Sequence, residues 1–314
     1  MPFSLPRRLA RIVKGLVLVL AFLIPAAVLF AYTPLSVLNL WADLGAYRRT
    51  TGLHYGNGPR QAIDLYWPDR PTGVSTPLPV VVFFYGGSWN RGERDDYRFV
   101  ASALAQRGMV VMVPDYRLYP EAAYPAFLQD AAQALAWGLE HASRYGGDPR
   151  RVFVIGHSAG AYNAAMLALD SRWLGATGHR PSELAGWVGL AGPYNFLPIQ
   201  NPEVKPVFHW PATPADSQPL AHVSGTAPPA LLIAPKEDEV VDPEQNSAAL
   251  YGALKNACVE VILKRYGVLN HATSVGALAP LLSWLAPVAD DVAAFIVDNA
   301  SANIPPRCAL SSAP

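Results

Sequence analysis

Residues 151–170 read RVFVIGHSAGAYNAAMLALD, in which an apolar run passes directly into an alanine-rich run. The letters VFVI predict a buried strand, and the alanine-rich run predicts a helix. Between them, Gly156 to Gly160 fit the pattern G-x-S-x-G, whose glycines are needed because side chains beside the serine would collide with neighbouring elements. The turn places Ser158 at a helix N-terminus, where negative charge is favoured. We predict that Ser158 is a nucleophile; a serine that merely forms a turn is the alternative.

A serine nucleophile needs a base, and the base needs an acid that orients it. For a serine at this kind of turn, the acid and then the histidine follow along the chain. The candidate histidines after Ser158 are His179, His209, His222 and His271. We expect His271 to be the base, because it follows the apolar strand expected at 260–266. The other three lie in loops, where a surface histidine is the simpler interpretation.

The acid is expected just beyond an earlier strand, and residues 229–235, PALLIAP, provide that strand. Four carboxylates follow it in quick succession, and most of such a run is usually a solvated loop. We favour Asp238 as the residue that reaches His271, with Asp242 as the alternative. The carboxylates are Glu237, Asp238, Glu239 and Asp242.

The rest of the chain alternates strand and helix signals. This alternation predicts an α/β fold with a mostly parallel sheet and helices on both faces. We expect helices at 98–108 and 125–145. The strands are expected at 61–68, 79–85, 109–116, 151–155, 184–194, 229–235 and 260–266.

Composition excludes some classes of function. The chain has 314 residues, of which 51% are hydrophobic, enough for one large core. Its 24 basic and 24 acidic residues balance, which argues against a nucleic-acid partner. Because no histidine or cysteine cluster has metal-ligand spacing, we expect no metal and no cofactor.

The N-terminus predicts a membrane segment. Residues 1–14 form a basic flank, and residues 15–32 are apolar and carry no charge. We interpret 15–32 as an uncleaved transmembrane signal anchor that leaves the catalytic domain outside the cytoplasm, periplasmic or extracellular. Residues 33–51 would link it to the domain. The alternative is a secreted protein cleaved after Ala31, although bulky Leu29 fits such a cleavage site poorly.

Six stretches carry a resemblance to a known family: YGGSW (85–89), PDYRLYPEAAYPAFLQDAAQALAW (114–137), GGDPRRVFVIGHSAGAYNAAMLAL (146–169), LAGPYNF (190–196), APPALLIAPKEDEVVDP (227–243) and LNHATSVGAL (269–278). With them, the chain from 53 to 299 resembles the α/β-hydrolase superfamily, in its esterase/lipase branch related to hormone-sensitive lipase and BD-FAE-type esterases. The resemblance implies a hydrolase domain at 52–300 with Ser158, Asp238 and His271 as a triad and no cofactor. It implies cleavage of carboxylic esters, whereas an amidase, arylformamidase or peptidase could use the same triad. A non-catalytic membrane-anchored binding protein is disfavoured by the complete triad.

The same resemblance implies an oxyanion hole in the glycine-rich turn after 79–85. There the backbone N–H groups of Gly87 and Ser88, joined by that of Ala159, would bind the oxygen that becomes negative. Tyr85 stands where the family usually has histidine. Its hydroxyl could shape the loop by hydrogen bonding, or the side chain could simply be the last aromatic of a buried strand.

Residues 196–229 are proline-rich and irregular, and we interpret them as a cap-like insertion. Aromatic side chains there and nearby could line an apolar substrate pocket, or they could only pin a long loop to the core. The pocket candidates are Trp89, Tyr194, Phe196 and Trp210. The expected substrate, by resemblance, is a small short-acyl or aryl ester.

The chain contains two cysteines, Cys258 and Cys308. The second lies in a C-terminal tail, 301–314, that has little else to hold it to the domain. Outside the cytoplasm an even number of cysteines permits one bridge. A Cys258–Cys308 disulfide is therefore expected as one of two outcomes, the other being two free thiols.

Overall fold

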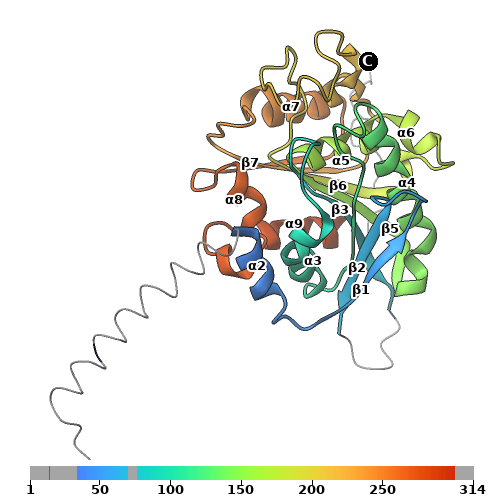
Figure 1. Cartoon of the computed structure of the whole chain (residues 1–314), viewed down its shortest axis with the longest axis vertical. Helices are drawn as coiled ribbons and strands as arrows, with labels where there is room; N and C mark the ends of the chain where they lie inside the picture. Colours follow the sequence, from blue (N-terminus) through green and yellow to red (C-terminus); the bar gives the residue numbers. More distant parts are fainter. Residues whose placement is uncertain (1–13, 15–33, 70–75, 301–314) are drawn as a thin grey trace, which may run out of the picture.

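The computed structural model describes residues 14, 34–69 and 76–300. One eight-stranded sheet runs through the molecule in the order β1-β2-β4-β3-β5-β6-β7-β8 (Figure 1). The pairings β1–β2 and β2–β4 are antiparallel and the others are parallel. The predicted α/β fold with a mostly parallel sheet is thus confirmed. The strands are β1 (Tyr47–His54), β2 (Ala62–Pro68), β3 (Leu78–Phe84), β4 (Val110–Pro114), β5 (Gly147–His157), β6 (Leu184–Leu190), β7 (Ala230–Pro235) and β8 (Val261–Tyr266).

Helices cover both faces of this sheet. Strand alternation sends Phe153 of β5 toward Phe295, with ring centroids 6.2 Å apart. On the opposite face, Val82 of β3 contacts Gly138. The helices are α2 (Pro34–Ala42), α3 (Arg98–Ala105), α4 (Ala126–His141), α5 (Ala159–Leu169), α6 (Ser171–Gly175), α7 (Ala249–Asn256), α8 (His271–Gly276) and α9 (Val288–Asn299). Phe295 belongs to α9 and Gly138 to α4, so these two helices lie on opposite faces.

Shorter helical turns connect these elements. They are η1 (Arg94–Tyr97), η2 (Ala142–Tyr145), η3 (Pro181–Glu183), η4 (Ala215–Ser217), η5 (Pro219–His222), η6 (Glu244–Ala248) and η7 (Pro280–Leu282). The helix expected at 125–145 is therefore α4 followed by η2. The segment 196–229 joins β6 to β7, and its Phe208 is fully buried. Because the ring of Phe208 lies 4.9 Å from that of Trp89, this segment packs on the body rather than standing away from it.

The prediction that residues 33–51 form a linker is wrong for the residues described. Helix α2 and the first half of β1 occupy them. Asn39 of α2 is buried, and its side-chain nitrogen donates to the carbonyls of Asp95 and Asp96 at 3.1 and 2.9 Å. Its side-chain oxygen accepts from the N–H of Phe99 at 3.0 Å. The hydropathy pattern cannot reveal such a contact across 60 residues.

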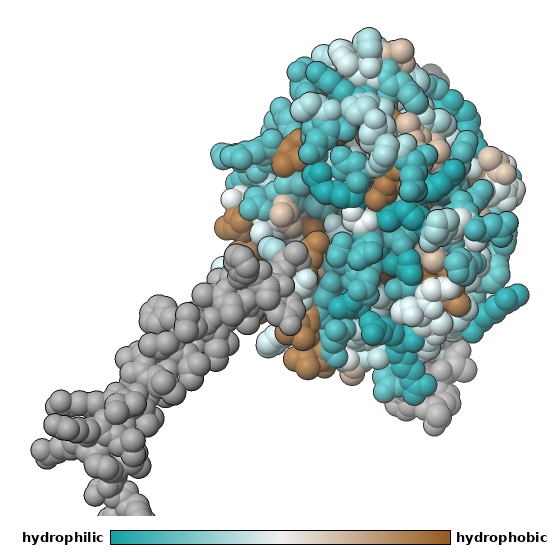
Figure 2. Space-filling view, viewed as in Figure 1, coloured by the Kyte–Doolittle hydropathy of each residue, from teal (hydrophilic) through white to brown (hydrophobic). Residues whose placement is uncertain are grey.

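The outer side of α2 stays apolar. Leu40, Trp41 and Leu44, just beyond its end, are all exposed. Brown apolar side chains gather in this region of the surface (Figure 2). The predicted spanning segment 15–32 lies outside the described residues. Within the described residues, no helix is both long enough and apolar enough to cross a membrane.

The C-terminal tail 301–314 also lies outside the described residues. Cys258, at the end of the loop before β8, is disulfide-bonded. Its predicted partner, Cys308, belongs to the undescribed tail. The pairing of these two cysteines stays a prediction.

Candidate active site

Ser158 sits at the abrupt turn between β5 and α5, where its backbone adopts φ 54° and ψ −122°. Few non-glycine residues take a positive φ, and such a conformation persists only when its surroundings enforce it. The flanking glycines show how tight the turn is. A Cβ on Gly156 would lie 2.1 Å from the carbonyl oxygen of Gly160. A Cβ on Gly160 would lie 2.0 Å from the carbonyl oxygen of Phe84 in the neighbouring strand.

The structure brings Ser158, His271 and Asp238 together. His271 lies at the start of α8, and its Nε2 is 2.8 Å from Ser158 Oγ. Its Nδ1 is 2.8 Å from Asp238 Oδ2. Asn270 caps α8 by accepting from the N–H of Thr273 at 2.8 Å, which fixes where the helix begins. The three side chains follow β5, β7 and β8. In the sheet, β7 and β8 are neighbours and β6 lies between β5 and β7.

Asp238 is held as a carboxylate. Burial of its side chain works against the charge, but the hydrogen bond from His271 and the nearby imidazole outweigh this. The N–H groups of Val240 and Val241 also donate to Asp238 Oδ1, at 2.8 and 3.1 Å. Together these contacts hold the pKa of Asp238 below its ordinary value. An ionised Asp238 keeps the proton of His271 on Nδ1 and leaves Nε2 free to accept from Ser158.

The alternative acid, Asp242, has a different task. Its Oδ1 accepts from the N–H groups of Glu244 and Gln245 at 2.8 and 3.1 Å, so it caps the turn before α7. The other histidines also lie in separate contacts. His179 Nδ1 pairs with Glu183, His209 Nε2 donates to the carbonyl of Tyr124, and His222 Nε2 donates to the carbonyl of Asp216.

The glycine-rich turn after β3 runs beside the nucleophile. A Cβ on Gly86 would lie 3.0 Å from Ser158 Cβ. Three consecutive residues then have positive φ: Gly87 at 121°, Ser88 at 52° and Trp89 at 56°. Gly87 also needs its small size, because a Cβ there would lie 2.3 Å from the carbonyl oxygen of Arg91. The structure therefore places two of the predicted oxyanion residues, Gly87 and Ser88, in a strained turn next to Ser158, and the third, Ala159, at the start of α5.

A cavity of about 300 Å³ opens at this point. Ser158, Ser88 and Ala159 line it, as do the pocket candidates Trp89 and Phe196. Most of the apolar wall of this cavity was not predicted from the sequence, because no periodic pattern marks loop residues that turn toward a cavity. These are Pro193, Pro198, Ile199, Val204, Val240 and Val241.

The pocket assignments of Tyr194 and Trp210 are wrong. Tyr194 is fully buried and packs edge-on against Trp187, with ring centroids 6.2 Å apart, beneath β6. Its ring fills the space that the missing side chain of Gly189 leaves. Trp210 is 40% exposed, and the Lys205 ammonium lies 5.7 Å from the centre of its ring. Both aromatics serve the loop and the core rather than the cavity.

His157, between Gly156 and Ser158, is a site residue that was not predicted from the sequence. Its ring is buried, and its Nε2 donates to the backbone carbonyl of His271 at 3.0 Å. Burial, and secondarily the neighbouring His271, lower the pKa of His157 to about 3. It is therefore neutral at ordinary pH. A polar residue at a position whose neighbours are all core residues was the available signal.

Comparison with known proteins decides the family. A model of the BD-FAE family matches residues 63–254, more than half of the chain, from within β2 to within α7. The chain belongs to the BD-FAE family. This match covers the serine elbow and the acid loop, while His271 lies beyond its end.

Curated relatives of this BD-FAE family member have esterase names. A probable isoprenylcysteine alpha-carbonyl methylesterase, ICMEL1, of Oryza sativa is 36% identical over 148 residues, 46% of this chain and 34% of the relative. Carboxylesterase NlhH of Mycobacterium tuberculosis is 43% identical over 138 residues, 44% and 42% of the two chains. Esterase LipC of the same organism is 29% identical over 225 residues, 64% and 55%. The match to ICMEL1 thus spans about a third of the relative's length.

Solved structures share the fold of the BD-FAE family member. An esterase from Pyrobaculum calidifontis superposes with a TM-score of 0.67 at 23% identity, covering 85% of this chain and 90% of the other. Esterase B from Lactobacillus rhamnosis gives 0.69 at 19% identity, with 88% and 94% coverage. These likenesses establish the α/β-hydrolase fold.

Within the described residues, no group of three or more histidine, cysteine or acidic side chains is placed to hold a metal ion.

Proposed function

We propose that this chain is a serine carboxylesterase that uses Ser158, His271 and Asp238. The observation that carries the proposal is the continuous pair of hydrogen bonds, both 2.8 Å, from Ser158 Oγ to His271 Nε2 and from His271 Nδ1 to Asp238 Oδ2. The esterase names of the curated relatives support the reaction class.

Catalysis would proceed through an acyl-enzyme. His271 takes the proton of Ser158 as the hydroxyl oxygen attacks the ester carbonyl, and Asp238 stabilises the imidazolium that forms. The N–H groups of Gly87, Ser88 and Ala159 stabilise the oxyanion of the tetrahedral intermediate. His271 then protonates the departing alcohol. Water, activated by the same histidine, attacks the acyl-enzyme and releases the acid.

The proposed substrates are esters with short acyl or aryl groups. The cavity of about 300 Å³ is at the small end of ligand sites, and Trp89 and Phe196 form an aromatic part of its wall. A longer chain would have to displace these side chains or leave the cavity. An amide substrate would use the same triad, and the assay below separates the two reactions.

We also propose that residues 15–32 anchor the protein in a membrane with the hydrolase domain outside the cytoplasm. The uncharged apolar sequence and the basic residues ahead of it support this proposal.

The test of the reaction combines labelling with hydrolysis. The full-length protein should react with a fluorophosphonate probe and hydrolyse p-nitrophenyl butyrate, and Ser158→Ala should abolish labelling and lower kcat by several orders of magnitude. Undiminished labelling of Ser158→Ala would exclude this nucleophile. Parallel assays with a formamide and a peptide test the amide alternative.

A further inference from the structure

Tyr85, at the end of β3, is the residue that departs from the usual histidine. Its ring is fully buried and stacks between two other tyrosines. The ring centroids of Tyr116 and Tyr97 lie 4.8 and 5.5 Å from that of Tyr85. The carbonyl of Tyr85 accepts from the hydroxyl of Tyr116 at 2.8 Å. The aromatic packing would survive the loss of the Tyr85 hydroxyl, so the ring and the hydroxyl can be tested separately.

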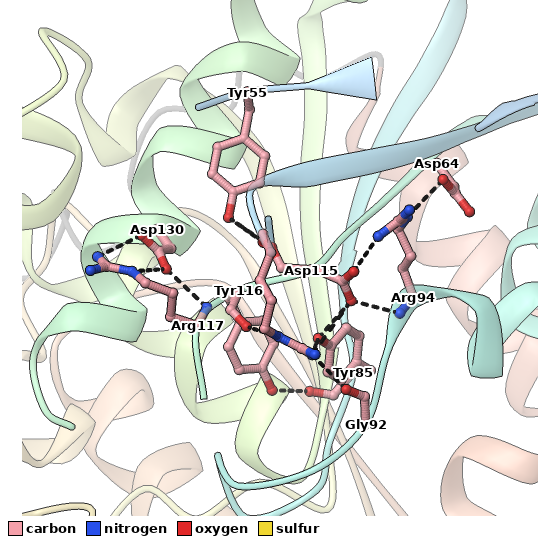
Figure 3. Close-up of polar contacts among 10 residues, drawn as sticks. Tyr55, Asp64, Tyr85, Gly92, Arg94, Asp115, Tyr116, Arg117 and Asp130 are labelled. Carbon is pink, nitrogen blue, oxygen red and sulfur yellow. Dashed lines mark hydrogen bonds and ion pairs between the residues drawn. The ribbon is translucent and has the colours of Figure 1, made fainter. Parts of the chain in front are cut away.

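The Tyr85 hydroxyl lies in a buried network of charged groups (Figure 3). It donates to Asp115 Oδ1 at 2.8 Å and accepts from Arg60 Nη2 at 2.8 Å. Asp115 also accepts from the backbone N–H of Arg94 at 2.8 Å and pairs with the Arg94 guanidinium. Arg94 Nε reaches Asp64 Oδ1 at 2.8 Å. Two guanidinium groups thus face two carboxylates, and each buried charge has a partner.

This network holds both ends of one loop. The loop begins at Tyr85, and its far end is fixed because Arg60 Nη2 also donates to the carbonyl of Gly92 at 2.6 Å. Arg60 Nε donates to the carbonyl of Tyr116 at 3.0 Å, which ties the loop to the strand-end segment after β4. Arg60 therefore bridges Tyr85 and Gly92, while Asp115 bridges Tyr85 and Arg94.

Between those fixed ends lies the strained turn with its three consecutive positive φ values at Gly87, Ser88 and Trp89. Ser88 and Trp89 are not glycine, so this conformation is intrinsically unfavourable and would relax if its ends were released. Burial, and then the negative charge of Asp115, raise the pKa of Tyr85 well above its ordinary value. The phenol therefore remains protonated and keeps donating to Asp115.

We propose that Tyr85 is a positioning residue whose hydroxyl, held by Asp115 and Arg60, keeps the Gly86–Trp89 turn in the geometry that binds the oxyanion beside Ser158. This inference rests on the proposed esterase function.

The test removes the hydroxyl alone. In the full-length protein, Tyr85→Phe should lower kcat for p-nitrophenyl butyrate by roughly tenfold to a hundredfold and change KM by less than about twofold, because misplaced donors weaken binding of the transition state more than of the substrate. Amide hydrogen exchange of the peptide covering residues 86–92 should become faster. Tyr66→Phe is the matched control, because Tyr66 is also fully buried but its hydroxyl has no hydrogen-bond partner among the described residues.

A second variant covers the case in which Tyr85→Phe fails to fold. Arg60 is 27% exposed, so Arg60→Gln can remove the bridge between Tyr85 and Gly92 from the surface side, and it should also accelerate exchange in residues 86–92. Unchanged exchange and unchanged kcat in Tyr85→Phe would overturn the proposal, as would an equal fall in kcat for Tyr66→Phe. If the wild-type protein hydrolyses no ester but exchange rises only in the Tyr85 and Arg60 variants, the positioning role stands and the esterase proposal fails.

Discussion

The residue before the nucleophile holds the backbone of the proposed catalytic base: His157 Nε2 donates to the carbonyl of His271 at 3.0 Å. Because that carbonyl belongs to the first residue of α8, the contact fixes the start of the helix and with it the direction of the His271 ring. A neutral His157 can donate this hydrogen bond without placing a second positive charge beside the imidazolium that forms during catalysis.

The first prediction concerns stability in acid. The pKa of His157 falls from 6.5 to about 3 on folding, so between these values the unfolded chain binds one more proton than the folded chain. Folding stability should therefore decrease as pH falls through this window, by up to about 1.4 kcal/mol per pH unit from this group. His157→Gln can still donate to the carbonyl but does not titrate. Urea unfolding between pH 7 and 4 should show a shallower loss for His157→Gln than for the wild type.

His179 supplies a control of opposite sign. Although burial opposes its charge, hydrogen bonds to Glu183 and Glu140 raise the pKa of His179 above its ordinary value. Its stabilising effect is full at low pH and is lost as pH rises through the folded pKa. The variant His179→Gln should therefore be less stable than the wild type mainly at acidic pH. Equal pH slopes for the wild type and His157→Gln would contradict a neutral, buried His157.

The second prediction separates the two candidate acids. Asp238→Asn should lower kcat by roughly ten-thousandfold with little change in KM, because the amide would favour the wrong tautomer of His271. Asp242→Asn should leave kcat nearly unchanged, since asparagine keeps an oxygen that can accept from the N–H groups of Glu244 and Gln245. Steady-state kinetics with a short-acyl ester would measure both. A severe loss of kcat in Asp242→Asn alone would show that Asp242, and not Asp238, is the acid.

The third prediction concerns acyl length. The wild type should prefer p-nitrophenyl butyrate to laurate, because the cavity has a volume of only about 300 Å³ and the rings of Trp89 and Phe196 are part of its wall. Phe196→Ala should raise the ratio of kcat/KM for laurate to that for butyrate, since the ring of Phe196 stacks 6.2 Å from that of Trp89 at the wall. Trp210→Ala is the control, because Trp210 is exposed and does not line the cavity. An unchanged ratio in Phe196→Ala would show that acyl groups bind elsewhere.

The fourth prediction tests topology. A reporter that works only outside the cytoplasm should be active when fused after Pro314, and the full-length protein should remain with membranes after alkaline washing. Activity of a cytoplasm-specific reporter at the same position would reverse the orientation. Release by the alkaline wash would remove the anchor.

The fifth prediction concerns the two cysteines. Non-reducing mass analysis of peptides should recover Cys258 linked to Cys308, and reduction should separate the two peptides. Cys258 is disulfide-bonded in the structure, and the chain has no other cysteine besides these two. Two free thiols in protein isolated from its own compartment would contradict the bridge and leave the topology proposal standing.

Local patterns predicted the centre of the site. Gly156 is required by a contact within the turn, with the carbonyl of Gly160, and Gly160 by a contact with Phe84 of the adjacent strand. Both glycines lie within five consecutive residues around Ser158, so a short sequence pattern reveals them. His271 and Asp238 could be chosen because parallel strands end at the same edge of a sheet, so loops distant in sequence meet there. The structure brings these three side chains together.

Contacts between distant segments escaped prediction. Whether Tyr194 faced the cavity or the core depended on the space above Gly189. The exposed position of Trp210 depended on the path of a long irregular segment. The docking of Asn39 onto η1 and the first turn of α3 needed three hydrogen bonds to residues that sequence patterns do not relate to it. Such choices are made by packing, for which single-sequence periodicity carries no signal.

The docking of α2 also limits how far the catalytic body can stand from its proposed anchor. The apolar segment 15–32 and α2 are separated by Thr33 alone, and Asn39 fastens α2 to the domain. One residue is too short to form a flexible linker between the two. If residues 15–32 cross a bilayer, the single residue before α2 would keep the folded body, and with it Ser158, close to the lipid. A glycine-serine insertion after Thr33 would lengthen that reach, and the rate on esters carried by large particles would then respond to linker length while the rate on small dissolved esters would not.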